Sequence, residues 1–117
     1  MIEERDCQLV VMGPFGRVDL WHVTQFETRV DNSSNGWEGA FNLERGSEVV
    51  DDFIARIEAA YNDGGAVPSV TLYQYIREND GSISTYQYDG VVFRLALVGR
   101  ASQQRVKFFA RGRRLIK

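Results

Sequence analysis

The chain has 117 residues, of which 44% are hydrophobic, 26% charged and 12% aromatic. This composition is typical of one soluble domain, and we expect residues 1–117 to form a single domain. No run of 18 apolar residues predicts a transmembrane helix, and the acidic residues 1–6 do not resemble a secretory signal. A single cysteine and a single histidine exclude an internal disulfide and a Cys/His zinc site of the usual kind.

The charges are unevenly distributed along the chain. Residues 1–99 hold all sixteen acids against seven arginines, a net charge of −9, whereas residues 100–117 hold seven basic residues and no acid. Apolar residues occupy every second position of 106–111, which predicts a strand, so the basic end is expected to belong to a folded surface. Such a surface could bind nucleic acid or meet the acidic surface of an identical neighbour.

The first half of the chain is rich in strand patterns. We expect strands at residues 8–12, 17–23, 25–31 and 37–44. A turn at Gly13–Gly16 and an Asn/Ser/Gly loop at 32–36 separate them. In the strand at 37–44, Glu38, Asn42 and Glu44 alternate with apolar residues, so this strand is expected to have one polar face.

Residues 47–61 carry the pattern of one amphipathic helix. Ser47 can cap the first turn, and apolar residues then recur at intervals of three and four to form a single stripe. Asp52 and Arg56 lie one turn apart off this stripe. The glycines at 64 and 65 end the helix. We expect the apolar stripe to pack against a sheet.

Strand patterns return in the second half, at residues 70–77, 83–89, 91–98 and 106–111. Asp80-Gly81 between the first two is a strong hairpin signal. A two-residue loop there predicts that four tyrosines share one face of the hairpin, with Tyr75 opposite Tyr86 and Tyr73 opposite Tyr88. Seven or eight strands and one helix predict an α+β domain that is mainly antiparallel β. We expect a barrel or sandwich of about seven strands, with the helix flanking or plugging it.

No residues of the chain form a catalytic or metal-binding motif. His22 has no nucleophile motif to act with, and Asp51 and Asp52 point about 100° apart on the helix, which prevents them from sharing a proton. The turn at Gly13–Gly16 lacks the lysine of a phosphate-binding loop. We therefore expect no catalytic residues, no cofactor and no metal, and a protein that is not an enzyme.

Four pieces of the sequence, taken in order, resemble a known family. They are Gly36-Trp37-Glu38-Gly39, the helix at 47–61 followed by Asp-Gly-Gly, the hairpin at 68–90, and the terminal segment at 105–114. The resemblance spans roughly residues 8–114, which is most of the chain. In this order and spacing they are similar to the tail tube proteins of contractile-tailed (myovirus-type) bacteriophages.

The resemblance implies a small barrel-like subunit that forms homohexameric rings stacked head to tail into a hollow tube. DNA passes through the lumen during ejection, and the tail sheath, baseplate and tail terminator proteins are further partners. It also implies a place in the virion tail after assembly in the host bacterial cytoplasm, with no cofactor and no membrane insertion.

The charge pattern suggests which residues would serve such an assembly. We expect the basic end to lie at the subunit interface, through Arg100, Arg105, Arg111, Arg113 and Arg114. We expect the polar face of the strand at 37–44 to face the lumen, through Glu38, Asn42 and Glu44. A lumen of negative sign would repel DNA phosphates and let the genome slide.

A second function remains open, that of a monomeric β-barrel binding single-stranded nucleic acid. Its tyrosine face would stack bases while the C-terminal arginines follow the phosphates. We favour the simpler interpretation that these tyrosines pack in the core or a subunit contact, as aromatic residues generally do. A strand and a loop also separate the arginines from the tyrosines, which a single binding groove would not require.

Overall fold

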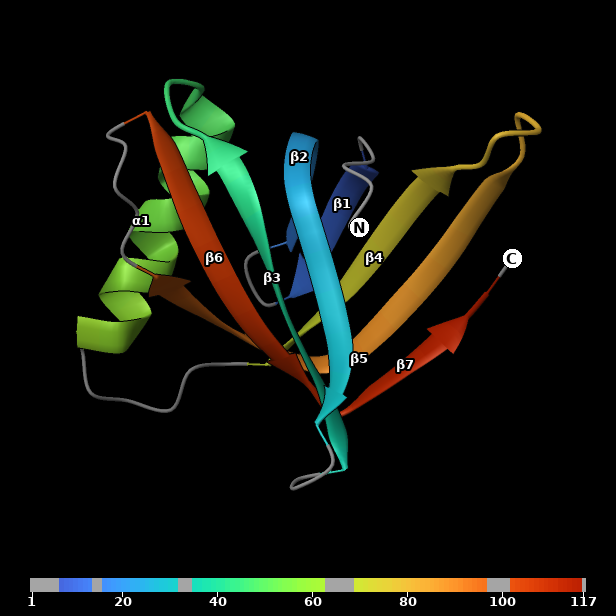
Figure 1. Ribbon diagram of the computed structural model, residues 1–117. Helices are drawn as coiled ribbons and strands as arrows, with labels where there is room; N and C mark the ends of the chain where they lie inside the picture. Colours follow the sequence, from blue (N-terminus) through green and yellow to red (C-terminus); the bar gives the residue numbers. More distant parts are fainter. Residues whose placement is uncertain (1–6, 14–15, 32–34, 63–68, 97–101, 117) are drawn as a thin grey trace.

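The computed structural model describes residues 7–13, 16–31, 35–62, 69–96 and 102–116. These residues form seven strands and one helix (Figure 1). In chain order they are β1 (Cys7–Gly13), β2 (Gly16–Asp31), β3 (Gly36–Glu44), α1 (Glu48–Asn62), β4 (Val70–Arg77), β5 (Ile83–Ala96), β6 (Gln103–Ala110) and β7 (Gly112–Leu115).

Six of the strands close into an antiparallel barrel. The order around it is β4-β1-β2-β3-β6-β5, and β5 pairs back with β4. Strand β7 pairs with the first half of β5, on the edge opposite to the one that pairs with β4. In Figure 1, β4, the first half of β5 and β7 therefore lie together and point away from the other strands. The expected α+β fold, mainly antiparallel β and barrel-like with one helix, is confirmed.

Two strands are longer than the sequence predicted, because each bends where a break was expected. Strand β2 continues through Gln25, whose φ of 51° accompanies a register shift between Thr24 and Glu27. Strand β5 continues through Gly90, whose φ is 61°. Such irregularities bend a strand without ending it. Each long strand therefore pairs with different neighbours in its two halves, which is how the barrel closes.

The predicted tyrosine ladder is wrong by one residue of register. Tyr73 lies opposite Gln87 and Tyr75 opposite Thr85, whereas Tyr86 and Tyr88 lie opposite Gln74 and Leu72. A shift of one residue moves a strand's side chains to the other face. The tyrosines of β4 and those of β5 are therefore on opposite faces of the hairpin, and Tyr88 is fully buried in the barrel.

The register differs because the hairpin loop has three residues instead of two. The N–H of Gly81 donates to the carbonyl of Glu78 at 3.0 Å, and Gly81 has a φ of 89°. Asp80 accepts hydrogen bonds from the N–H of Ser82 at 2.9 Å and from its hydroxyl at 2.6 Å, which lowers the pKa of Asp80. A turn followed by one left-handed residue is the usual three-residue hairpin connection.

The helix forms as the sequence predicted. The hydroxyl of Ser47 accepts the N–H of Val50 at 3.1 Å, which caps the first turn, and Asp52 and Arg56 form an ion pair at 3.3 Å. The apolar stripe covers one end of the barrel, where the ring of Phe53 meets the edge of Phe93 with centroids 5.3 Å apart. Within the described residues, no helix has both the length and the apolar character that crossing a membrane requires.

Aromatic rings fill the middle of the barrel. Phe41 is fully buried, and its ring centroid lies 6.0 to 6.2 Å from those of Phe26, Phe93 and Phe108. Gly39 leaves room for this packing. A Cβ at Gly39 would lie 2.5 Å from Phe108 Cζ and 2.5 Å from a backbone oxygen of β2, so a larger residue would force the sheet apart.

Candidate functional site

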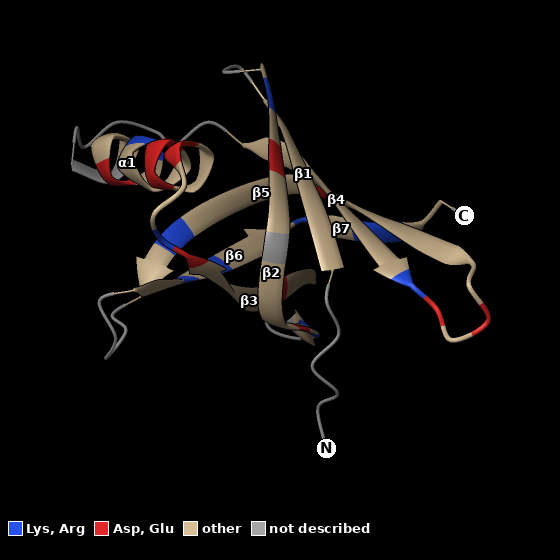
Figure 2. Ribbon diagram, turned by 90° about the horizontal axis from the view of Figure 1, so that it is seen from above, with Lys and Arg blue, Asp and Glu red and all other residues tan. Residues whose placement is uncertain are grey.

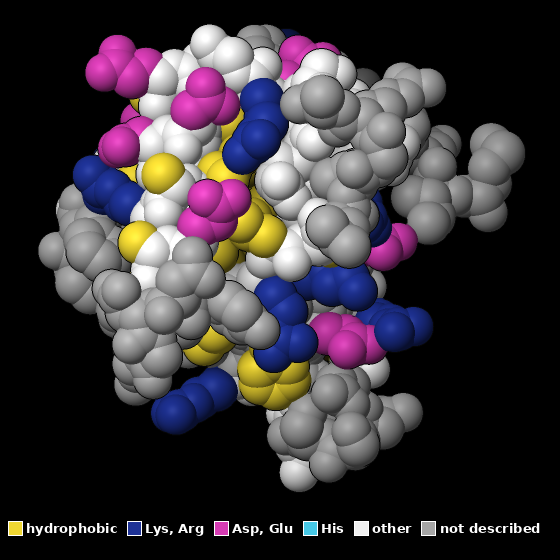
Figure 3. Space-filling view, turned by 90° about the vertical axis from the view of Figure 1, so that its left-hand side faces the viewer, with side chains coloured by type: hydrophobic (Ala, Val, Ile, Leu, Met, Phe, Trp, Pro, Cys, Tyr) yellow, Lys and Arg dark blue, Asp and Glu magenta, His cyan; other side chains and the backbone are white. Residues whose placement is uncertain are grey.

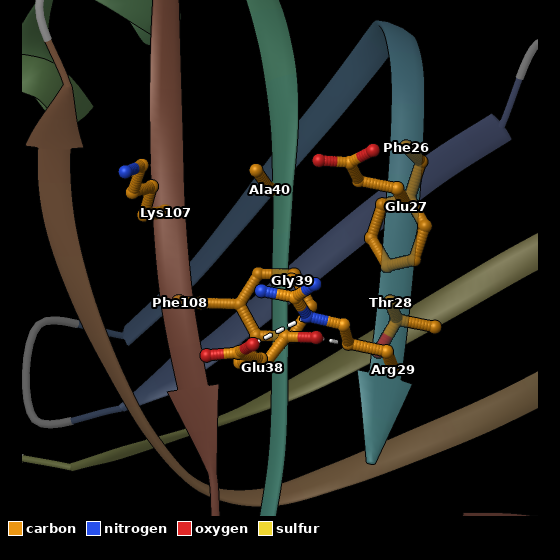
Figure 4. Close-up of a pocket in the computed structure, with 9 residues that line it drawn as sticks. All are labelled: Phe26, Glu27, Thr28, Arg29, Glu38, Gly39, Ala40, Lys107 and Phe108. Carbon is orange, nitrogen blue, oxygen red and sulfur yellow. Dashed lines mark hydrogen bonds and ion pairs between the residues drawn. The ribbon is translucent and has the colours of Figure 1, made fainter. Parts of the chain in front are cut away.

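A cavity of about 610 Å³ opens between β2, β3 and β6 (Figure 4). It is lined by Phe26, Glu27, Thr28, Arg29, Glu38, Gly39, Ala40, Lys107 and Phe108. Its charged groups have both signs, and Arg29 and Glu38 form an ion pair within it. None of the nine lining residues is a histidine or cysteine, and no group of three metal-ligating side chains occurs among the described residues. Charged side chains and the aromatic side chains of Phe26 and Phe108 thus line the cavity together.

Arg105 and Asn42 lie beside this cavity and contact each other. The guanidinium of Arg105 donates to Asn42 Oδ1 at 2.8 Å and to Glu27 Oε1 at 2.7 Å. The amide of Asn42 in turn donates to Gln25 Oε1 at 3.1 Å. Arg105, which was expected at the subunit interface, thus contacts Asn42, which was expected at the lumen. The expected interface residues and the expected lumen residues therefore meet on one surface at this point.

The polar face of β3 is less acidic than its sequence suggested. Strand β6 pairs with β3 so that Asn42 lies opposite Arg105, while Lys107 lies opposite Ala40 on the same face. Glu38 and Glu44 remain accessible, but Asn42 is only 6% exposed. The face that carries Glu38, Asn42 and Glu44 therefore continues onto β6 as a face of mixed charge. Nothing in β3 itself shows which strand will lie next to it.

Arg113 has a partner within the chain that the sequence did not reveal. Its guanidinium carbon lies 4.0 Å from the ring centroid of Tyr86 and 4.7 Å from that of Trp37. Its Nε is buried without a hydrogen-bond partner. A cation between two aromatic faces is attracted by the rings. Arg113 therefore fills the barrel end opposite α1, where the sequence predicted an interface residue.

The hydroxyl of Tyr88 lies beside Arg113 at this end and donates to Gln74 Oε1 at 3.2 Å. Burial raises the pKa of Tyr88, while the charge of Arg113 and hydrogen bonding with Thr28 and Arg113 oppose this shift. Tyr88 therefore keeps a neutral hydroxyl inside the barrel, and its buried ring presents no surface on which a nucleic-acid base could stack.

The remaining predicted arginines divide into two groups. Arg111 and Arg114 are exposed, and the stem of Arg111 lies over Gly90. Arg100 lies outside the described residues. A further basic pair was missed: Arg94 on β5 lies directly opposite Lys107 on β6, and both are exposed. The alternation of both strands was visible in the sequence, but their pairing was not.

Comparison of the chain with protein-family models, with curated proteins and with solved structures found no match. The functional conclusions below therefore rest on the residues and their arrangement.

Proposed function

We propose that this chain is a structural subunit of a hollow tube, of the tail tube type of contractile-tailed bacteriophages. In this proposal homohexameric rings stack head to tail, DNA is passing cargo, and sheath, baseplate and terminator proteins are the other partners. The subunit would act in the virion tail after assembly in the host bacterial cytoplasm, and its role is structural instead of catalytic.

The observation that carries this proposal is the segregation of unpaired charge on a closed barrel. Acids gather on α1, whereas Arg94, Lys107, Arg111 and Arg114 lie on β5, β6 and the residues that follow (Figure 2). Complementary surfaces on one molecule favour heterologous contacts, which repeat into rings and filaments. The antiparallel barrel with one flanking helix is also the fold that the sequence resemblance implies.

We assign the two kinds of surface as follows. Glu38 and Glu44 on β3 face the lumen, with Asn42 buried between them on the same face, and Arg111 and Arg114 take part in subunit contacts. In a ring of six strands, the outward directions of strands two places apart differ by roughly a third of a turn. The outer faces of β3 and β5 can therefore serve different contacts, although β6 joins them.

Electron microscopy tests the proposal directly. Purified, nuclease-treated protein is expected to form rings or hollow rods in negative stain, and to show matching masses in solution. A cryo-EM map of such rods that placed Glu38 and Glu44 on the outer wall would refute the lumen assignment. A monomer at every concentration that binds single-stranded nucleic acid in a salt-sensitive manner would refute the tube.

Binding of single-stranded nucleic acid remains the second candidate function, but fewer residues now support it. The exposed cations Arg94, Lys107, Arg111 and Arg114 favour it. The expected tyrosine platform does not exist, because Tyr88 is buried and the other tyrosines are divided between two faces. Base stacking would have to come from other side chains.

A further inference from the structure

One row of side chains crosses the outer face of four neighbouring strands. Glu27 on β2 lies directly opposite Ala40 on β3. Ala40 in turn lies opposite Lys107 on β6, which lies opposite Arg94 on β5. Neighbouring strands are about 4.8 Å apart, so the long side chains of this row stand close together. Because Ala40 has only a methyl group, the row is hollow there, within the cavity of about 610 Å³ (Figure 4).

The carboxylates that line this cavity already have partners within the chain. Arg105 binds Glu27 at 2.7 Å, and Arg29 forms an ion pair with the other acid of the lining. Lys107 and Arg94 are exposed, and neither forms an ion pair with a described residue. Like charges directly opposite each other destabilise a sheet. The row thus keeps two uncompensated cations, which a partner with negative charge would stabilise.

Apolar surface lies next to these two cations. Phe109 and Val92 lie directly opposite each other, two residues farther along the same face of β6 and β5. Val92 is 37% exposed, and Phe109 is half-buried. Figure 3 shows basic side chains gathered below α1, with hydrophobic side chains next to them. Arginine and aromatic side chains are enriched where proteins bind each other, so this surface fits a peptide segment with carboxylates and an apolar side chain.

Residues 1–6 have this combination of side chains. Their sequence, Met-Ile-Glu-Glu-Arg-Asp, holds three acids and one arginine, and Ile2 directly precedes Glu3 and Glu4. No other stretch outside the described residues holds more than one acid. The segment leads into Cys7, the first residue of β1. Six extended residues span about 20 Å, which is enough to reach a neighbouring molecule.

We propose that residues 1–6 of one copy bind across this row on a second copy. This inference rests on the proposed self-assembly and names one of its contacts. Glu3 and Glu4 neutralise the two cations, and the main chain of the segment passes over the hollow at Ala40. Ile2 covers the apolar pair beside the cations. Opposite charges steer association and exclude wrong partners. The cations lie on β6 and β5, beside the proposed lumen face of β3, so both assignments can hold together.

A synthetic peptide of residues 1–6 tests this site without requiring assembly. The labelled peptide is added to the unaltered chain below the concentration at which the chain assembles, and fluorescence anisotropy measures binding. Its affinity should fall about tenfold or more for Arg94→Glu with Lys107→Glu, because the site then repels its acids. A peptide with Glu3→Lys and Glu4→Lys should show the opposite preference.

Two further variants separate the site from net charge. Arg45→Glu with Arg77→Glu changes the net charge by the same amount at exposed positions outside the row, and should bind the peptide as the unaltered chain does. Ala40→Leu fills the hollow without changing any charge, and should weaken peptide binding by about tenfold. Circular dichroism and thermal unfolding of every variant establish that the fold is retained.

Mixing experiments test whether the contact joins two copies. Glu3→Lys with Glu4→Lys should raise the concentration needed for assembly about tenfold or more, and so should Arg94→Glu with Lys107→Glu. An equal mixture should assemble as the unaltered chain does, because each reversed segment then meets a reversed site on another copy. Sedimentation of nuclease-treated protein measures the assembled fraction. Recovery in one chain with all four changes, but not in the mixture, would place the contact within a single copy and overturn the proposal.

The possible outcomes separate this contact from the proposed function. Peptide binding that depends on Arg94 and Lys107, with recovery of assembly on mixing, supports the contact. Rods from every variant at the normal concentration would overturn the contact and leave the tube standing. Specific peptide binding with discrete dimers restored by mixing would support the contact but contradict the tube. If Arg94→Glu with Lys107→Glu lost only affinity for single-stranded DNA, nucleic acid would be the occupant and the contact would be overturned.

Discussion

The two ends of the barrel are filled in different ways. At the end covered by α1, the interior is apolar, with Phe53 against Phe93 and aliphatic residues around them. At the other end, the guanidinium of Arg113 lies against aromatic rings, and the buried Tyr88 donates to Gln74. A helix closes the first end, whereas the short strand β7 brings a cation to the second.

This difference shows that a small barrel can close its interior without an entirely apolar core. Hydrophobic burial is not directional, so the stability of the α1 end depends on how well the volumes and shapes of its side chains fit together. The stability of the other end depends on where the guanidinium of Arg113 lies, because aromatic rings attract a cation over their faces. We therefore expect the two ends to respond differently to substitution.

The largest effect is expected at the α1 end. Phe93→Ala removes a ring that contacts both Phe41 and Phe53 and leaves a cavity, so the free energy of unfolding should fall by about 3–5 kcal/mol. Urea denaturation measures this free energy. The control is Ile83→Ala, at a residue that is 52% exposed, and it should change the free energy of unfolding by less than about 0.5 kcal/mol. Equal effects would mean that Phe93 does not belong to the core.

An intermediate effect is expected at the other end. Arg113→Ala removes the cation from between Trp37 and Tyr86, and should lower the free energy of unfolding by about 1–2 kcal/mol. Arg114→Ala removes the same charge one residue later, at an exposed position, and should have little effect. Comparable losses in the two variants would show that net charge, and not stacking, explains the role of Arg113.

The buried hydroxyl predicts a dependence on pH at the Arg113 end. Because the folded pKa of Tyr88 lies above its usual value, the folded protein retains this proton while the unfolded chain loses it near pH 10. Stability should therefore fall as pH rises above about 10. Tyr88→Phe should flatten this fall in unfolding curves taken between about pH 9 and 11. An unchanged slope would assign the loss to other groups.

The smallest effect is expected on the surface of α1. Asp52→Asn breaks an exposed ion pair with Arg56 and should cost about 0.3–0.5 kcal/mol at low salt, and less at high salt. Thermal unfolding at two salt concentrations measures this. A loss that did not depend on salt would point to a role for Asp52 other than pairing.

Local features of the fold were visible in the sequence. The cap at Ser47, the apolar stripe of α1 and the alternation of the strands each depend on residues a few positions apart. Even the bends in β2 and β5 coincide with predicted breaks, because Gly90 and the residues around Gln25 interrupt the alternation. What the sequence could not reveal there is that each strand continues beyond its bend.

The candidate site was visible only in part. The basic end and the polar face of β3 were recognised, yet the contact between Arg105 and Asn42 depends on the pairing of β3 with β6. Arg94 and Lys107 likewise become one patch only where β5 and β6 meet. Residues so far apart in the chain leave no local pattern by which to predict that they lie side by side.

The sequence alone thus determined the type of each element and the separation of charge along the chain, because these follow from neighbouring residues. Tertiary structure decided the register of the β4–β5 hairpin, where one extra loop residue placed the tyrosines of β4 and those of β5 on opposite faces. It also decided that Arg113 lies against Trp37 and Tyr86. Strand pairing and ring stacking join distant residues, and their energies are realised only when the barrel has closed.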